Sequence, residues 1–136
     1  MAELFKVVVA GSRELTDYAL VCEKLDNLLR NKATVEIVHG GCRGADLLGK
    51  RYAAERGYAC REVEADWDTH GKNAGPIRNK EMSLYADACV VFKPTNIESY
   101  GSKDMIRQAE RAGIPIRVVN YLQEVVPKRM YSRAVT

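Results

Sequence analysis

The sequence predicts an α/β fold: a single doubly wound domain with a mainly parallel, five-stranded sheet. Short apolar runs alternate along the chain with longer amphipathic stretches, an order that is typical of parallel βαβ units with right-handed crossovers. The first two apolar runs lead into glycines, Gly11 and Gly40, as strands do where the chain turns into a helix. The chain has 136 residues, which is enough for one hydrophobic core and too few for two.

Five apolar runs have the length and composition of buried strands. The third run is more polar than the others, and we expect it near an edge of the sheet. The predicted strands span residues 5–10, 35–38, 58–63, 88–92 and 115–119.

Four amphipathic stretches follow the first four strands and predict helices. Thr16 can cap the first helix, and Pro76 suits the first turn of the third. Gly57 and Gly113 stand where a helix C-terminus favours a left-handed residue. The predicted helices span residues 16–31, 45–56, 77–85 and 102–112, with polar loops at 66–76 and 94–101, a domain over 1–120 and a C-terminal tail over 121–136.

Composition restricts the classes of function. The formal net charge is +3, from 21 basic and 18 acidic residues, which fits a weakly basic pocket better than a nucleic-acid-binding surface. The four cysteines have no CxxC spacing, so no metal site is expected. No apolar run approaches the roughly 20 residues that span a bilayer, and no signal-peptide pattern is present. We therefore expect a cytoplasmic protein without membrane association.

The glycine-rich turn after the second predicted strand is the most informative motif. Gly40, Gly41 and Gly44 lie between a β-branched run and a helical pattern. Such a turn can present backbone N–H groups and a helix N-terminus to an anion. Arg43 in the same turn can add a positive charge with forked donors. The motif predicts a binding site for a phosphate-bearing small molecule.

Other unusual residues also follow predicted strands. Because ligands of parallel α/β sheets bind beyond the carboxyl ends of the strands, we expect these residues to share one cleft with the glycine turn. Four of them have a structural alternative. Arg13 can be a surface residue, and Arg78 can form an interface or fold-stabilising salt bridge. Trp67, a base-stacking candidate, can be part of a packed lid, and Asp46, a candidate for binding a ribose, can simply favour the helix dipole. The full set of predicted ligand-binding residues is Gly11, Ser12, Arg13, Gly40, Gly41, Arg43, Gly44, Asp46, Trp67, Arg78, Asn79, Gly101 and Ser102.

Four motifs together resemble the SLOG superfamily, which includes LOG-type phosphoribohydrolases and the DNA-processing protein A fold. They read GSR, GGCRGAD, ADWDTHGKNAGPIRN and SYGSKDMIRQAERAGIPI, in that order. The chain is most similar to the small stand-alone YspA-related branch. The resemblance covers residues from about 5 to 119 and implies a Rossmann-like fold with a nucleotide or nucleotide-derived ligand in the cleft.

The sequence departs from the LOG-type enzymes at one important position. Their PGGxGTxxE motif carries a Glu that contributes to hydrolysis of the N-glycosidic bond, whereas Met105 stands at the corresponding position here. Asp104 is one residue away, and a step of one residue turns a helical side chain by about 100°. If the protein is a hydrolase, Asp66, Asp104 and Asp46 are the candidate catalytic carboxylates, with Asp66 preferred.

Two hypotheses remain from the sequence. In the first, the protein binds a nucleotide-type ligand as a sensor or sequestering module, and the resemblance implies a role in nucleotide signalling or phage–host conflict. In the second, it cleaves the N-glycosidic bond of a nucleoside 5′-monophosphate. The missing Glu favours binding, and no cofactor is expected. Binding of single-stranded DNA is disfavoured by the low net charge, and a homodimer or higher oligomer is expected through helices beside the site.

Overall fold

The computed structural model describes residues 3–124 of the chain. Five parallel strands form one sheet in the order β3-β2-β1-β4-β5, which confirms the predicted fold class. The strands are β1 (Leu4–Gly11), β2 (Thr34–His39), β3 (Ala59–Glu62), β4 (Ala88–Pro94) and β5 (Ile116–Tyr121). The helices are α1 (Tyr18–Leu29), α2 (Ala45–Arg56), α3 (Trp67–His70), a 3₁₀ turn η1 (Gly71–Asn73), α4 (Ala74–Tyr85) and α5 (Tyr100–Ala112).

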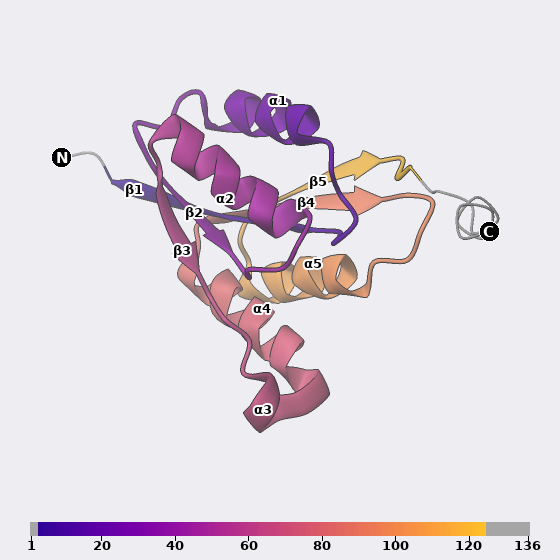
Figure 1. Ribbon diagram of the computed structural model, residues 1–136. Coiled ribbons are helices and arrows are strands. Elements are labelled where there is room, and N and C mark those ends of the chain that lie inside the picture. Colours follow the sequence, from indigo (N-terminus) through magenta and orange to yellow (C-terminus); the bar gives the residue numbers. More distant parts are fainter. Residues whose placement is uncertain (1–2, 125–136) are drawn as a thin grey trace.

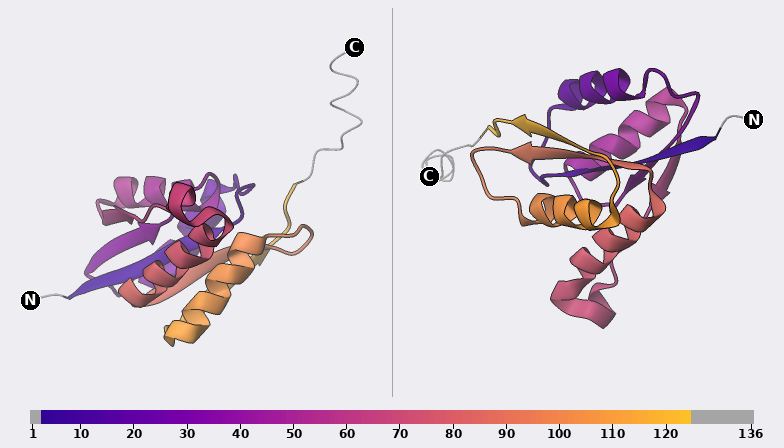
Figure 2. Two further views of the ribbon diagram at one scale, coloured as in Figure 1. Left: turned by 90° about the horizontal axis from the view of Figure 1, so that it is seen from below. Right: turned by 180° about the vertical axis from the view of Figure 1, so that it is seen from behind.

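The helices cover both faces of the sheet (Figure 1). Helices α1 and α2 lie on one face, and α4 and α5 lie on the other, as the view from behind in Figure 2 also shows. Successive side chains of the central strand, β1, point to opposite faces of the sheet. Val7 and Val9 belong to the core beneath α1 and α2, and Val8 belongs to the core on the other face. This is the pattern of a parallel strand that is buried on both sides.

A glycine lets helix α2 lie close to the sheet. A Cβ atom on Gly49, in α2, would lie 2.8 Å from Val9 Cγ1, so the absence of a side chain allows α2 to pack directly on β1. Gly57 and Gly113 end α2 and α5 in the left-handed conformation, as the sequence predicts.

Several element boundaries differ from the predictions. Residues 66–76 are mostly helical rather than a loop, because the Asp66 side chain caps α3 by accepting a hydrogen bond from Thr69 N and α4 begins before Pro76. A proline in the first turn of a helix leaves no intrahelical N–H bond unmade. Asp17, not Thr16, caps α1.

The C-terminal side of the sheet extends slightly further than predicted. Strand β5 includes Tyr121, which pairs with Pro94 of β4, so the sheet continues one residue past the predicted domain end at 120. The predicted tail lies otherwise almost entirely outside the described residues. Strand β3 lies at one edge of the sheet, in agreement with its polar sequence. Within residues 3–124, none of the helices combines the length and apolarity that a membrane span requires.

Candidate functional site

The strand order places a switch point between β1 and β4. The chain leaves β1 toward β2 through α1 on one face, and it leaves β4 toward β5 through α5 on the opposite face. The connections therefore diverge and leave a crevice beyond the carboxyl ends of these two strands. A cleft of about 370 Å³ lies there, within the size range of small-molecule sites.

The cleft combines segments that are far apart in the sequence. Residues after β1 form one wall, residues after β4 form another, and side chains from the starts of α2 and α4 complete it. Its lining residues are Ala10, Gly11, Ser12, Arg13, Glu14, Cys42, Asp46, Arg78, Asn79, Met82, Glu98, Ser99, Tyr100, Gly101 and Met105.

Seven of the predicted ligand-binding residues meet in this cleft, and six do not line it. Those in the cleft are Gly11, Ser12, Arg13, Asp46, Arg78, Asn79 and Gly101. Those outside its lining are Gly40, Gly41, Arg43, Gly44, Trp67 and Ser102.

The glycine turn after β2 already holds an anion, which is the carboxylate of Asp46. Its Oδ2 atom accepts hydrogen bonds from Gly40 N at 2.8 Å and from Cys42 N at 3.4 Å. Between them, Gly41 N donates to His39 Nδ1 at 3.0 Å. Three consecutive N–H groups are thus satisfied within the protein. Contrary to the prediction from the sequence, they are not free to bind a ligand.

Asp46 itself is a buried carboxyl group with a perturbed pKa. Burial raises its pKa to about 6, although the N–H donors of Gly40 and Cys42 and the charges of Arg78 and Arg13 oppose this rise. The hydrogen bonds from Gly40 and Cys42 both end on Oδ2, and the residue lines the cleft. A carboxyl group with this pKa and position can accept a hydrogen bond from a ligand hydroxyl or take part in proton transfer.

The glycines of the turn have steric roles. A Cβ atom on Gly44 would lie 2.3 Å from the carbonyl oxygen of Ser12, and Gly44 has a φ of +80°. Without that side chain, Ala45 N reaches Ser12 O at 3.1 Å and joins the start of α2 to the end of β1. A Cβ atom on Gly41 would lie 2.9 Å from the Glu62 carboxylate. Gly44 is therefore needed for packing beside the cleft, whereas Gly41 is favoured mainly by its φ of +77°, since the flexible Glu62 side chain can move.

Arg78 and Asn79, near the start of α4, connect the two helical layers. The buried guanidinium of Arg78 donates to Gly40 O at 2.8 Å through Nη1 and to Asn79 Oδ1 at 3.0 Å through Nε. Its Nη2 lies 4.0 Å from Cys42 Sγ, and Asn79 donates to Asp104 Oδ2 at 2.9 Å. Arg78 thus braces the glycine turn while it lines the cleft; its recorded partners are a carbonyl oxygen, an amide oxygen and a thiol, not the carboxylate of the salt bridge considered from the sequence.

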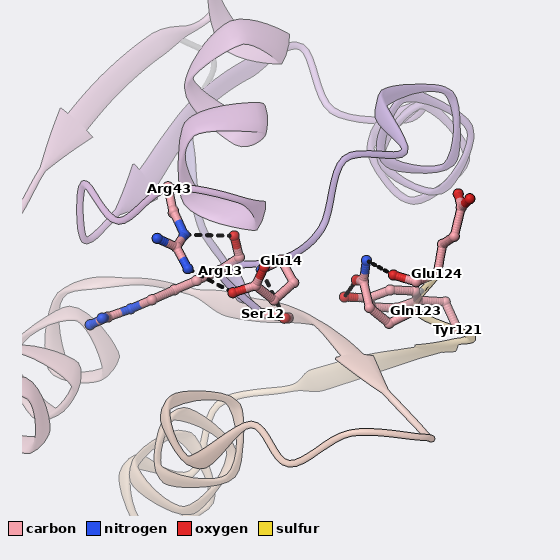
Figure 3. Close-up of polar contacts among 7 residues, drawn as sticks. All are labelled: Ser12, Arg13, Glu14, Arg43, Tyr121, Gln123 and Glu124. Atoms are coloured by element: carbon pink, nitrogen blue, oxygen red, sulfur yellow. Dashed lines mark hydrogen bonds and ion pairs between the residues drawn. The ribbon is translucent and has the colours of Figure 1, made fainter. Parts of the chain in front are cut away.

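The two other predicted arginines differ in their placement (Figure 3). Arg43 turns to Glu14 and forms an exposed ion pair of 2.7 Å with it. Its Nε also donates to the carbonyl oxygen of Arg13 at 3.4 Å. The side chain of Arg13 extends in a different direction, away from Tyr121, and lines the cleft.

The N-terminus of α5 forms another wall of the cleft. Ser99 is the N-cap residue, but its side chain makes no capping hydrogen bond; its hydroxyl instead lies 2.6 Å from the hydroxyl of buried Ser102. Gly101 has open space where a side chain would be. The start of α5 is therefore accessible to an anion, which the helix dipole favours there.

The residues preferred for catalysis lie mostly elsewhere. Asp66 lines a separate depression with Trp67 and Asp68, and its hydrogen bonds with Thr69 hold the pKa of its carboxyl below the usual range. Asp104 lines a groove next to the cleft and receives the hydrogen bond from Asn79. Of the three candidate carboxylates, only Asp46 lines the cleft.

Sequence reasoning missed several cleft residues, notably Tyr100, Met82 and Cys42. Tyr100 follows β4 and lies in a family-like motif, so its position could have been inferred. Met82 lies two turns inside α4, and nothing in the sequence distinguishes it from a core residue.

Fold and site together define a Rossmann-like α/β protein with a cleft at the switch point of its sheet. Residues 5–70 match the model of a protein family that is described as "YspA, cpYpsA-related SLOG family". The Gene 61 protein of Mycobacterium phage D29 is 39% identical over 118 residues, which cover 82% of this chain and 93% of that protein. The chain belongs to the YspA-related SLOG family.

A solved structure supports the fold. DNA processing protein A from Streptococcus pneumoniae superposes with a TM-score of 0.66 at 20% sequence identity, over 85% of this chain. The match spans 50% of the length of that protein.

Proposed function

We propose that this protein binds a nucleotide or nucleotide-derived ligand in the cleft between the ends of β1 and β4, as a sensor or sequestering module. The observation that carries the proposal is that a buried arginine, Arg78, and a buried carboxyl, Asp46, both line one cleft at the switch point. Burial of two ionisable groups is costly unless they have partners, and both groups also line a cavity of ligand size.

The walls of the cleft suit the parts of a nucleotide. Arg13 and the open N-terminus of α5 at Gly101 offer positive potential for a phosphate. Asp46 offers an acceptor for a hydroxyl group of a ribose. Met82 and Met105 supply apolar surface for a base, and the Tyr100 ring is largely exposed at the rim.

A hydrolase remains the second candidate because of Asp46. Met105 replaces the Glu of the LOG-type enzymes, and Asp66 lies outside the cleft. Asp46, with a pKa of about 6, is suited to exchange a proton near neutral pH. Hydrolysis of a nucleoside 5′-monophosphate would therefore depend on Asp46 rather than on Asp66 or Asp104.

One experiment separates these two functions. The purified protein is incubated with a panel of nucleosides and nucleotides, and both the shift in melting temperature and the release of free base are measured. Stabilisation without base release supports a binding module, and base release that is lost in Asp46→Asn supports the hydrolase. If no member of the panel shifts the melting temperature or is consumed, the proposal is wrong.

The biological setting is part of the proposal. The similarity to a mycobacteriophage protein supports a role in phage–host conflict or nucleotide signalling, and we propose that the protein acts there in the cytoplasm. A homodimer or higher oligomer is also proposed. The sequence offers Met82, Leu84, Tyr85, Met105 and Ile106 on these helices for such a contact; Met82 and Met105 are buried in the core, whereas Leu84 is 68% exposed.

A further inference from the structure

A second groove continues from the cleft along the starts of α4 and α5. Its volume is about 430 Å³. It shares Arg13, Arg78, Asn79, Tyr100 and Gly101 with the cleft, so the two cavities are adjoining compartments. A ligand that contacts these shared residues can enter both.

The two compartments differ in charge. The groove is lined by five cationic side chains and by Asp104 as its one carboxylate, whereas the cleft has two cationic side chains and three carboxylates. The side chains that line the groove therefore have a summed formal charge of +4, which exceeds the net charge of +3 of the whole chain. Lys72, Lys103 and Arg107 are the cations that line the groove and not the cleft.

The ion pairs of the groove leave much of this charge available. Lys103 pairs with Glu98 at 2.6 Å, on the cleft side, and Arg107 approaches Asp104 only to 3.7 Å. Both basic side chains are about half exposed, and such surface pairs contribute little stability. An incoming anion can therefore compete for both cations.

From this division we infer that the ligand is a nucleotide with a chain of two or more phosphates, whose nucleoside lies in the cleft and whose phosphate chain lies in the groove. The inference rests on the proposed function and specifies its ligand class. The shared cations Arg13 and Arg78 are sufficient to balance one phosphate monoester. The three additional cations, two of which have only exposed ion pairs within the protein, are matched better by a ligand with more negative charge.

The test compares a nucleoside with its 5′-mono-, di- and triphosphates by isothermal titration calorimetry, without divalent cations. The triphosphate is expected to bind at least about tenfold more tightly than the monophosphate, because it gains charge-assisted contacts. In the double variant Lys72→Ala/Arg107→Ala this difference is expected to disappear, with the affinity for the nucleoside unchanged.

A matched control removes two cations from a different groove. Lys80 and Arg111 line a depression that shares no residue with the cleft, so Lys80→Ala/Arg111→Ala should retain the preference for the triphosphate. Melting temperatures of all variants show that they are folded.

The outcomes separate the inference from the proposed function. Equal affinity for mono- and triphosphate in the unaltered protein overturns the inference and leaves nucleotide binding intact. Failure of every nucleotide to bind overturns both. A single-stranded oligonucleotide is tested as well. If it binds more tightly than the triphosphate, and if this binding depends on Lys72 and Arg107, the groove is a binding site for a polynucleotide and the inference is overturned.

Discussion

Arg78 donates a hydrogen bond of 2.8 Å to the carbonyl oxygen of Gly40, across 38 positions of the sequence. The contact joins α4, on one face of the sheet, to the turn that starts α2 on the other. A Cβ atom on Gly40 would lie 2.4 Å from Arg78 Nη1, so the guanidinium occupies the space that a side chain at residue 40 would need. The shape of the cleft floor depends on this pair.

We expect Arg78→Ala to weaken nucleotide binding by about ten- to hundredfold, because it removes a charge-assisted contact and the brace of the glycine turn. Calorimetric titration measures the loss. Arg43→Ala is the matched control, since Arg43 does not line the cleft and its ion pair with Glu14 is exposed. Equal affinities of the two variants would argue against a role of Arg78 in the site.

Gly44→Ala is expected to destabilise the fold by more than about 2 kcal/mol. The new Cβ would add a clash with Ser12 O to the strain of a positive φ, and that strain alone is of order 1–3 kcal/mol. Gly57→Ala provides the comparison, because Gly57 also has a positive φ but no neighbouring atom within 4 Å. Urea unfolding should show the smaller loss for Gly57→Ala; equal losses would mean that the approach of α2 to β1 tolerates a side chain.

Asp46 should make the stability of the protein depend on pH. Because the pKa of Asp46 is raised from 3.8 to about 6 in the folded state, the folded state binds the proton more tightly than the unfolded state does. The resulting stabilisation is complete below about pH 4 and is lost as the pH rises through 6, a change of about 3 kcal/mol. The free energy of unfolding of the unaltered protein relative to Asp46→Asn should therefore fall between those pH values. A constant difference would contradict the pKa.

His39 should produce the opposite dependence. Burial lowers the pKa of His39 from 6.5, and its Nδ1 accepts the hydrogen bond from Gly41 N, which a protonated ring cannot do. Its contribution to stability is thus present above pH 6.5 and is lost as the pH falls through the lowered pKa. Relative to His39→Gln, the unaltered protein should lose stability on acidification over this range. Denaturant unfolding at several pH values tests the sign.

Asp46→Asn and Asp66→Asn should differ in their effect on the ligand. Asp46 lines the cleft, so its replacement should change nucleotide affinity and abolish any base release. Asp66 caps α3 outside the cleft, and its replacement should leave affinity within about twofold, since no contact of order 1 kcal/mol is lost. Binding and base release are measured on both variants. A larger effect of Asp66→Asn would restore the original preference for that residue.

The sequence predicted the fold well because its signals are local. The apolar runs and the glycines Gly57 and Gly113 mark strands and helix ends through periodicity and backbone conformation, which neighbouring residues decide. The same local signals placed Arg13, Arg78 and Gly101 at one edge of the sheet. Segment 66–76 was misjudged because its polar composition resembles a loop, although the side chain of Asp66 supplies a helix cap.

The role of the glycine turn could not be predicted from the sequence. A free phosphate loop and a loop that binds its own carboxylate have similar sequences, because both need glycines ahead of a helix. The choice depends on the side chain of Asp46 folding back onto Gly40 N, which is a tertiary contact. The side-chain conformation that brings Arg43 to Glu14 likewise cannot be predicted from the pattern of residues along the sequence.

The internal carboxylate of Asp46 also affects how this site can evolve. Where backbone N–H groups hold a ligand, a substitution does not remove those donors, so recognition by them is tied to the backbone conformation. Here those groups are engaged by the protein itself, so selectivity depends on side chains such as Arg13, Arg78 and Tyr100. The side chains of Arg13 and Tyr100 can be exchanged by one codon change while the turn stays intact, whereas Arg78 also braces the turn. Relatives with this turn can therefore diverge in ligand choice and keep the same scaffold.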